Sequence, residues 1–198
     1  MVWLYGARIA DLPDPLENPE AMVGLPEERI EKIKSIKRAI QRRQSLGAGL
    51  LLEYAKKQHL NLDKVYSNLS HSGEYVVCAI STEPVGCDLE KIEDAPLKVA
   101  ERRFCKGEIE YLCSLDDALR NAEFYRIWTI KESYMKMTGE GLRMGLGSFE
   151  VSFGDEITIQ KEGKQVACYI KEYPLDGYKI SVCSEDNDYA EELLIVNI

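Results

Sequence analysis

The chain has few of the residues that build metal centres from cysteine and histidine. Its 198 residues include only two histidines, His59 and His71, and its six cysteines form no C-x-x-C pair or other zinc spacing. No apolar run approaches the roughly 20 residues of a membrane span. The N-terminus lacks a basic region followed by an apolar stretch and a cleavage site. We therefore expect reduced cysteines and a cytoplasmic protein that associates with no membrane.

Basic charge is scarce overall but concentrated in one segment. The chain has 25 Lys and Arg against 34 Asp and Glu, a net charge of −9, which disfavours general nucleic-acid binding. Seven basic residues nevertheless lie between Arg29 and Arg43. Such a stretch is typical of either a local anion site or a solvated helix face, and charge alone does not decide between them.

The apolar periodicity predicts helices and strands in both halves of the chain. Helices are expected over about 26–43, 46–58, 95–104, 106–119 and 123–138, the last of them ended by Gly139. Strands are expected over 2–9, 74–80, 85–91, 148–153, 156–161, 165–171, 177–184 and 190–197. The order is not a simple β-α-β alternation, so the sequence predicts the α+β class.

The first segment with chemical interest is Val85-Gly-Cys-Asp-Leu-Glu-Lys91. In a strand, residues two apart point to the same face, so Asp88 and Glu90 would project together. Two neighbouring carboxylates are hard oxygen ligands of the kind that suits Mg²⁺. The same D-x-E pattern is also common on exposed strand faces, and the segment alone leaves both interpretations open.

A second segment lies in the helix expected over 123–138. Trp128, Glu132 and Lys136 are spaced four residues apart, so they share one face. The pattern fits a buried Trp beside an exposed Glu–Lys pair, which is worth only about 0.3–0.5 kcal/mol. It also fits a third carboxylate with a lysine one turn away to meet a phosphate.

The third feature is Asn68-Leu-Ser-His-Ser-Gly73. The His71 imidazole and the hydroxyls of Ser70 and Ser72 could bind a phosphate by hydrogen bonds. The alternative is a turn built from Ser, Asn and Gly. The glycine pairs elsewhere lack the spacing of a phosphate-binding loop and are expected to serve packing or turns.

The combination of these segments is more specific than any one of them. The order N-L-S-H-S, V-G-C-D-L-E-K and F-Y-R-I-W-T-I-K-E-S-Y-M-K, followed by G-E-G-L-R-M-G-L-G-S-F-E-V, resembles the Sfp-type 4′-phosphopantetheinyl transferases. The resemblance covers about residues 26–184, and W-x-x-K-E-S-x-x-K is its most specific part. It implies transfer of the phosphopantetheine arm of coenzyme A to a serine of an acyl or peptidyl carrier protein, with Mg²⁺ bound and adenosine 3′,5′-bisphosphate released.

The same resemblance implies roles for single residues. Asp88 and Glu132 would bind Mg²⁺, and Glu90 would be a further ligand or hold a metal-bound water. Lys136 would meet the phosphates and assist the leaving group, while Ser70 and His71 would also contact cofactor phosphates.

Arg43 would match a basic residue that serves the 3′-phosphate of the cofactor. Glu132, Lys136 and His71 would then be the catalytic residues, with Glu132 accepting the proton of the carrier serine. Mg²⁺, Lys136 and His71 would offset the charge that builds on the phosphate oxygens.

The family fold implied is a pair of similar α/β subdomains, a pseudo-dimer with the cofactor in the cleft between them. The expected division is 1–85 and 86–198, within a monomer. Relatives usually carry a longer stretch, often with G-x-P, before N-[LIV]-S-H-S, and here Leu62–Ser67 runs almost directly into Asn68. The nucleotide contacts are therefore the part of the match that this departure affects.

Three other functions fit parts of the pattern: a binding protein with weak turnover, a metal-dependent phosphohydrolase, and a purely structural domain. Carrier proteins are usually acidic near the modified serine, so a basic patch is expected at the cleft mouth. The candidates for this patch are Lys98, Arg102, Arg103 and Lys106.

Overall fold

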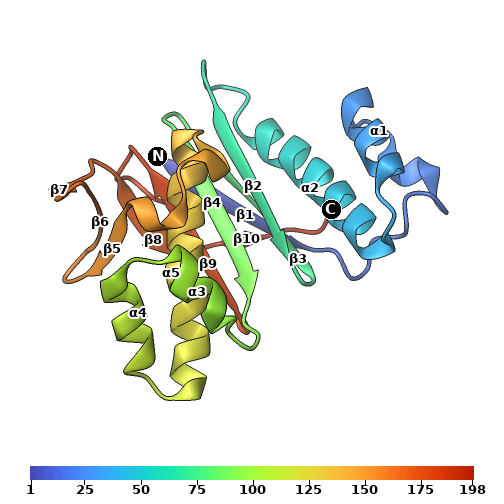
Figure 1. Cartoon of the computed structure of the whole chain (residues 1–198). Coiled ribbons are helices and arrows are strands. Elements are labelled where there is room, and N and C mark those ends of the chain that lie inside the picture. Colours follow the sequence, from blue (N-terminus) through green and yellow to red (C-terminus); the bar gives the residue numbers. More distant parts are fainter.

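The first half of the chain forms an antiparallel sheet covered by a long helix (Figure 1). The computed structural model describes the backbone of residues 1–198 and every side chain except that of Leu142. The sheet contains β1 (Val2–Arg8), β3 (Tyr75–Ser81) and β2 (Tyr66–Ser72) in that order, with β10 (Leu194–Ile195) parallel to β1 at the edge. The helices are η1 (Pro19–Met22), α1 (Glu27–Ser35) and α2 (Ala39–Gln58).

α2 packs closely on this sheet because a glycine stands at the contact. Ala48, Leu51 and Ala55 of α2 join the buried cluster with residues of β1 and β3. A Cβ on Gly47 would lie 2.6 Å from a methyl carbon of Ile9. Gly47 is therefore a packing glycine, as the sequence predicted.

The second half builds a sheet against one central helix. β4 (Val85–Lys91), β9 (Tyr178–Ser184) and β8 (Tyr169–Glu172) pair in that order, and α5 (Asp117–Thr138) packs across β4 and β9. A small separate sheet contains β5 (Glu150–Phe153), β6 (Ile157–Lys161) and β7 (Lys164–Gln165). The remaining helices are α3 (Leu97–Arg103), α4 (Lys106–Cys113), η2 (Gly141–Arg143) and η3 (Leu146–Ser148).

The two sheets meet where β2 and β4 lie side by side in the middle of the molecule (Figure 1). The Asn68 side chain accepts a hydrogen bond from the Cys87 amide at 3.1 Å across this junction. The mixed architecture confirms the predicted α+β class. The division at residue 85 stays a prediction, and β10, from the far end of the chain, pairs with β1 of the first sheet.

Two local predictions from the sequence are wrong. The expected helix over 26–43 breaks after Ser35, and α2 starts at Ala39. The guanidinium of Arg42 donates hydrogen bonds to the carbonyls of Ile36 at 3.1 Å and Lys37 at 2.8 Å. These two carbonyls at the break therefore have hydrogen-bond partners outside a helix. The segment Tyr66–Ser72 is β2, so the turn that Ser, Asn and Gly suggested for 68–73 begins only at Gly73.

The helices expected over 106–119 and 123–138 both exist, but the break between them comes earlier: α4 ends at Cys113 and α5 already begins at Asp117. α5 begins at Asp117, where Asp116 caps it by accepting a hydrogen bond from the Leu119 amide at 3.0 Å. It ends at Gly139 with a left-handed φ of 72°, as the sequence predicted. Of the strand expected over 190–197, only Leu194–Ile195 pairs with a neighbour. Within the described residues, no helix has both the length and the hydropathy of a membrane span.

Candidate active site

Asp88 is the centre of a polar cluster at the junction of the two sheets. Its side chain is only 6% exposed. It accepts hydrogen bonds from Ser70 Oγ of β2 at 2.9 Å and from Lys136 Nζ of α5 at 2.7 Å. Lys136 also donates to the Cys87 carbonyl at 3.0 Å and to Ser70 Oγ at 3.2 Å. Three elements therefore converge on one carboxylate, while the cofactor contacts that the sequence predicted for these three residues stay a prediction.

Gly86 allows the helix to approach so closely. A Cβ at this position would lie 2.0 Å from the Ser133 carbonyl oxygen and 2.4 Å from the Met137 amide nitrogen. The backbone of α5 thus rests directly on β4. This contact brings Lys136 within hydrogen-bond distance of Asp88.

Glu90 and Glu132 carry the other two carboxylates of the cluster. Glu90 lies on the same face of β4 as Asp88 and accepts a hydrogen bond from Ser72 Oγ at 2.8 Å. Burial, together with the charge of Asp88, raises the pKa of Glu90 to about 7. Burial and Asp88 also raise the pKa of Glu132, against the opposite effect of Lys136. The three acids therefore lie close enough to repel one another.

Lys136 is the cation that balances this repulsion. Burial works against its charge, but the neighbouring groups, Asp88 first and then Cys87 and Glu132, together outweigh burial and raise the pKa of Lys136. Burial likewise raises the pKa of Asp88, while Lys136 acts in the opposite direction. Lys136 thus stays charged in a site where more negative than positive groups meet.

The carboxylates fit a divalent cation, although they do not already form a closed cage. Among the described residues, no three His, Cys, Asp or Glu side chains surround a common point where a metal ion could sit. Asp88 Oδ2, however, is buried and has no hydrogen-bond partner in the described part of the chain. Buried polar atoms normally have one, and oxygen ligands of this type suit Mg²⁺. The metal ligands Asp88, Glu90 and Glu132 stay a prediction.

His71 lies apart from this cluster. Side chains alternate along β2, so Ser70 and Ser72 face β4 while His71 points to the opposite face. There it lines a hollow of about 440 Å³ between α1, α2 and β2. The hollow is lined by Arg29, Lys32, Ile36, Gln41, Ser45, Ala48, Leu69 and His71.

This hollow, named the basic hollow below, is suited to an anion. Among the described residues that line it there are two cations and no carboxylate. Ser45 Oγ is buried without a hydrogen-bond partner within the described structure. Partial desolvation of the His71 ring lowers its pKa, and the charges of Lys136 and Lys32 act in the same direction. The sequence counted Arg29 and Lys32 in a basic stretch but did not single them out, because only the fold brings α1 beside β2.

The adjacent arginines of α2 have different surroundings. Arg42 forms an ion pair with Asp14 and lowers the pKa of that carboxyl to about 2. Arg43 does not belong to the lining of the basic hollow, and its buried Nε lacks a hydrogen-bond partner within the described residues. The structure therefore does not bring Arg43 together with His71, and its contact with a cofactor phosphate stays a prediction.

A second hollow, of about 350 Å³, lies beside Glu132 and is named the apolar hollow below. Trp128 and Glu132 both line it, which confirms that they share a face of α5. The other lining residues come from α3, α5 and the segment after η2: Val99, Arg102, Arg103, Met135, Gly145 and Leu146. The carboxylate cluster thus has a basic hollow on the β2 side and a largely apolar one on the α3 side.

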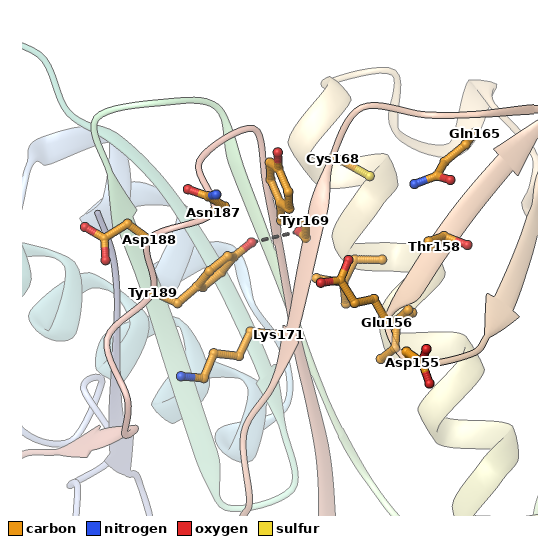
Figure 2. A pocket seen from close by; sticks show the side chains of 12 residues that line it. Asp155, Glu156, Thr158, Gln165, Cys168, Tyr169, Lys171, Asn187, Asp188 and Tyr189 are labelled. Carbon is orange, nitrogen blue, oxygen red and sulfur yellow. Dashed lines mark hydrogen bonds between the residues drawn. The ribbon is translucent and has the colours of Figure 1, made fainter.

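Another hollow, of about 640 Å³, lies away from these residues, between β6, β8 and the segment 187–189 (Figure 2). Tyr189 crosses its floor and donates a hydrogen bond to the Tyr169 carbonyl at 2.7 Å. Asp155, Glu156 and Asp188 stand at its two sides without converging. None of the residues that the sequence singled out lines it.

Comparisons with known proteins show which family the chain is similar to. The sequence pattern of the family described as "4'-phosphopantetheinyl transferase superfamily" matches residues 84–183, which include β4 and α5. The chain is 36% identical over 148 residues to 4'-phosphopantetheinyl transferase Sfp of Bacillus subtilis (strain 168), covering 73% of this chain and 66% of that protein. It is 41% identical over 122 residues to 4'-phosphopantetheinyl transferase gsp of Aneurinibacillus migulanus, covering 61% and 52% respectively.

Among solved structures, a holo-(acyl-carrier-protein) synthase from Bacillus anthracis str. Ames, in complex with CoA (3',5'-ADP), superposes with a TM-score of 0.45 at 17% identity. The superposition covers 51% of this chain and 93% of that one. In sequence, the chain spans 66% of the length of the Bacillus subtilis relative.

Proposed function

This chain belongs to the 4'-phosphopantetheinyl transferase superfamily, and we propose that it transfers the 4′-phosphopantetheine group of coenzyme A to a serine of an acyl or peptidyl carrier protein. The observation that carries this proposal is the convergence of Ser70, Asp88 and Lys136 beside Glu132 at the junction of β2, β4 and α5. The reaction forms a bond between the serine oxygen and the phosphorus that carries pantetheine. It breaks the pyrophosphate bond and releases adenosine 3′,5′-bisphosphate.

Asp88, Glu90 and Glu132 would hold a divalent cation in this proposal. A bound Mg²⁺ neutralises pyrophosphate charge and polarises the phosphoryl oxygens. The partnerless oxygen of Asp88 supports the assignment. So does the pKa of Glu90, which burial raises first and the charge of Asp88 raises further, to about 7.

Proton transfer falls to Glu132 and Lys136. A carboxylate with a raised pKa is a competent base for the carrier serine hydroxyl, and burial raises the pKa of Glu132. Lys136 would donate a hydrogen bond to the leaving phosphate oxygen, replacing part of its present contact with Asp88. Charge would then build where a fixed ammonium already stands.

The two hollows suggest how coenzyme A divides between the sheets. The basic hollow, with Arg29, Lys32 and His71, would take phosphates of the nucleotide end. The apolar hollow beside Glu132 would take the pantetheine side and the approaching carrier. His71 then contributes to binding of the nucleotide end, and a catalytic role for its imidazole stays a proposal.

The carrier is proposed to approach over α3 and the start of α4. Lys98, Arg102, Arg103 and Lys106 are all exposed there, and two of them reach the rim of the apolar hollow. A row of cations beside Glu132 complements an acidic carrier surface. Charge reversal of Arg102 and Arg103 together is expected to raise the KM for the carrier, and an unchanged KM would remove this surface from the proposal.

A cytoplasmic, monomeric state completes the proposal. The six cysteines, all free among the described residues, support the cytoplasmic part of this proposal.

The test is the intact mass of an apo carrier protein after incubation with this protein, coenzyme A and Mg²⁺. A gain of one phosphopantetheine unit on the carrier supports the transferase. Nucleotide released from coenzyme A without a carrier would favour a phosphohydrolase instead. Coenzyme A binding with no mass gain on several unrelated carriers would favour a binding protein.

A further inference from the structure

The lysine next to Glu132 in the W-x-x-K-E-S-x-x-K segment has a different environment from Glu132. Lys131 is completely buried, and its ammonium donates to the Leu146 carbonyl at 2.9 Å, to the Phe149 carbonyl and to Glu108 Oε1 at 2.8 Å. An ammonium has three hydrogens to donate, and all three have acceptors here. The proposed transfer chemistry uses none of them.

Glu108 completes the network from the first turn of α4. Its side chain is 2% exposed. Oε1 accepts the Val151 amide at 2.8 Å in addition to Lys131, and Oε2 accepts the Cys105 amide at 2.9 Å. The two buried charges are thus paired with each other and fully hydrogen-bonded to backbone groups of neighbouring segments.

These contacts join the separate walls of the apolar hollow. Leu146 belongs to one wall, and its carbonyl accepts a hydrogen bond from Lys131. Arg103 belongs to another wall and precedes Cys105 by two residues. The two walls also touch, because a Cβ on Gly147 would lie 3.2 Å from the Arg103 carbonyl oxygen.

Stability alone is a poor explanation for this pair. Removing two charges from water costs several kcal/mol per ion in general, and apolar replacements of similar volume are often equally stable. Buried pairs are better suited to fixing a particular arrangement of the segments around them. The arrangement fixed here is that of the two segments that face Glu132 across the apolar hollow.

We propose that Lys131 and Glu108 are positioning residues that hold the α3–α4 connection and the 144–151 segment in the shape that the carrier recognises. The carrier part of this inference rests on the proposed function. The pair sets the distance between Glu132 and the exposed Arg102 and Arg103, without touching substrate. Loss of the pair would therefore loosen the apolar hollow. The basic hollow, which is built from α1, α2 and β2, would stay intact.

The test uses the double substitution Lys131→Met and Glu108→Gln, which removes both charges and keeps similar volumes. The matched control is Arg126→Met with Glu172→Gln, which removes another ion pair of α5, at 2.7 Å, on the side facing β8. Hydrogen exchange of the amides in 144–151 is expected to accelerate at least about tenfold in the first variant and not in the control. Exchange in β4 is expected to stay as in the wild type.

Kinetics separate positioning from general damage. The first variant is expected to raise the KM for the carrier about tenfold, in the range of modest misplacement effects. The Kd for adenosine 3′,5′-bisphosphate, the part of coenzyme A assigned to the basic hollow, is expected to stay unchanged. Wild-type exchange in 144–151 together with an unchanged carrier KM would overturn the proposal. So would an equal loss of affinity for the carrier and for adenosine 3′,5′-bisphosphate, since that indicates a global change.

A milder variant decides the matter if the double variant does not fold. Lys131→Arg keeps the charge but cannot place its planar donors on the same three acceptors. It is expected to raise the carrier KM and the exchange rate of 144–151, and an unchanged result for both would contradict the proposal. If wild-type protein modifies no carrier, the proposed function and the carrier part fall, while the exchange data still decide whether the pair holds the segment.

Discussion

Replacing Gly86 with alanine tests the contact that assembles the active site. The new Cβ would lie 2.0 Å from the Ser133 carbonyl oxygen and 2.4 Å from the Met137 amide nitrogen. Non-bonded heavy atoms rest at about 3.5–4.0 Å, so α5 must retreat from β4 by about 1 Å or more. Both obstructing atoms belong to the backbone, and no side-chain rotation can relieve the overlap.

The expected loss of stability in Gly86→Ala is about 1–3 kcal/mol, the usual cost of overpacking. For a chain of this size that corresponds to a fall in Tm of roughly 2–12 °C. The transfer rate is expected to fall about 100-fold, because a shift of about 1 Å separates Lys136 and Glu132 from Asp88. Thermal unfolding followed by circular dichroism and the intact-mass assay measure the two effects.

Gly154→Ala is the matched control. A Cβ there would have its nearest contact at 3.8 Å, from the Glu156 carbonyl oxygen, and Gly154 has no positive φ. Its stability is expected to stay within about 0.5 kcal/mol of the wild type. Wild-type Tm and transfer rate in Gly86→Ala would refute the claim that the backbone of α5 rests on β4.

Three further predictions concern charged groups. Lys32→Gln is expected to weaken binding of adenosine 3′,5′-bisphosphate by about fivefold, the upper range for an exposed ion pair. Lys34 lies on the same helix but pairs with Glu31, so Lys34→Gln is expected to leave the affinity unchanged. Calorimetric titration of both variants measures the two affinities. Desolvation and neighbouring cations lower the pKa of His71, so a bound phosphate is expected to raise this pKa. NMR titration of the imidazole with and without adenosine 3′,5′-bisphosphate measures the change. If the pKa does not rise on binding, the nucleotide binds elsewhere. Asp14 has its pKa lowered from 3.8 to about 2 by the hydrogen bond from Arg42, so its contribution to stability is complete above about pH 4 and is lost as the pH falls towards 2. Urea unfolding of Asp14→Asn at a series of pH values is expected to show a flatter dependence across that window, and a slope equal to that of the wild type would contradict the role of this pair.

The sequence predicted the elements whose signals are local. The strand over 85–91 and the helix that ends at Gly139 both follow from periodicity and capping, and the structure confirms them. The family assignment, made from W-x-x-K-E-S-x-x-K, is also confirmed. The shared face of Trp128 and Glu132 needed only the helical repeat.

The sequence missed features that depend on neighbours in space. β2 reads as a turn because Asn68, Ser70 and Ser72 are polar, yet their partners are polar groups of β4 rather than water. The break before α2 depends on Arg42, whose guanidinium reaches back to the end of α1. No local pattern encodes either contact.

Burial of charge was the other feature hidden from sequence reasoning. Lys131 and Glu132 are neighbours in one motif, but one is wholly buried against Glu108 and the other faces a hollow. The helical repeat alone predicts the direction in which each side chain points, but it does not predict which residues cover that side chain. The role of Lys131 therefore became visible only when α4 and the segment after η2 were in place.

The most direct test of the central claim compares carrier modification by the wild type, Glu132→Gln and Glu140→Gln. Glu140 lies just beyond the end of α5 and is exposed, so its variant controls for loss of one negative charge near the helix end. The account predicts a gain of one phosphopantetheine unit on the carrier with the wild type and Glu140→Gln, its loss on addition of EDTA, and at least about a 100-fold slower gain with Glu132→Gln. Wild-type rates with Glu132→Gln, at unchanged stability, would contradict the assignment of the active site to this junction.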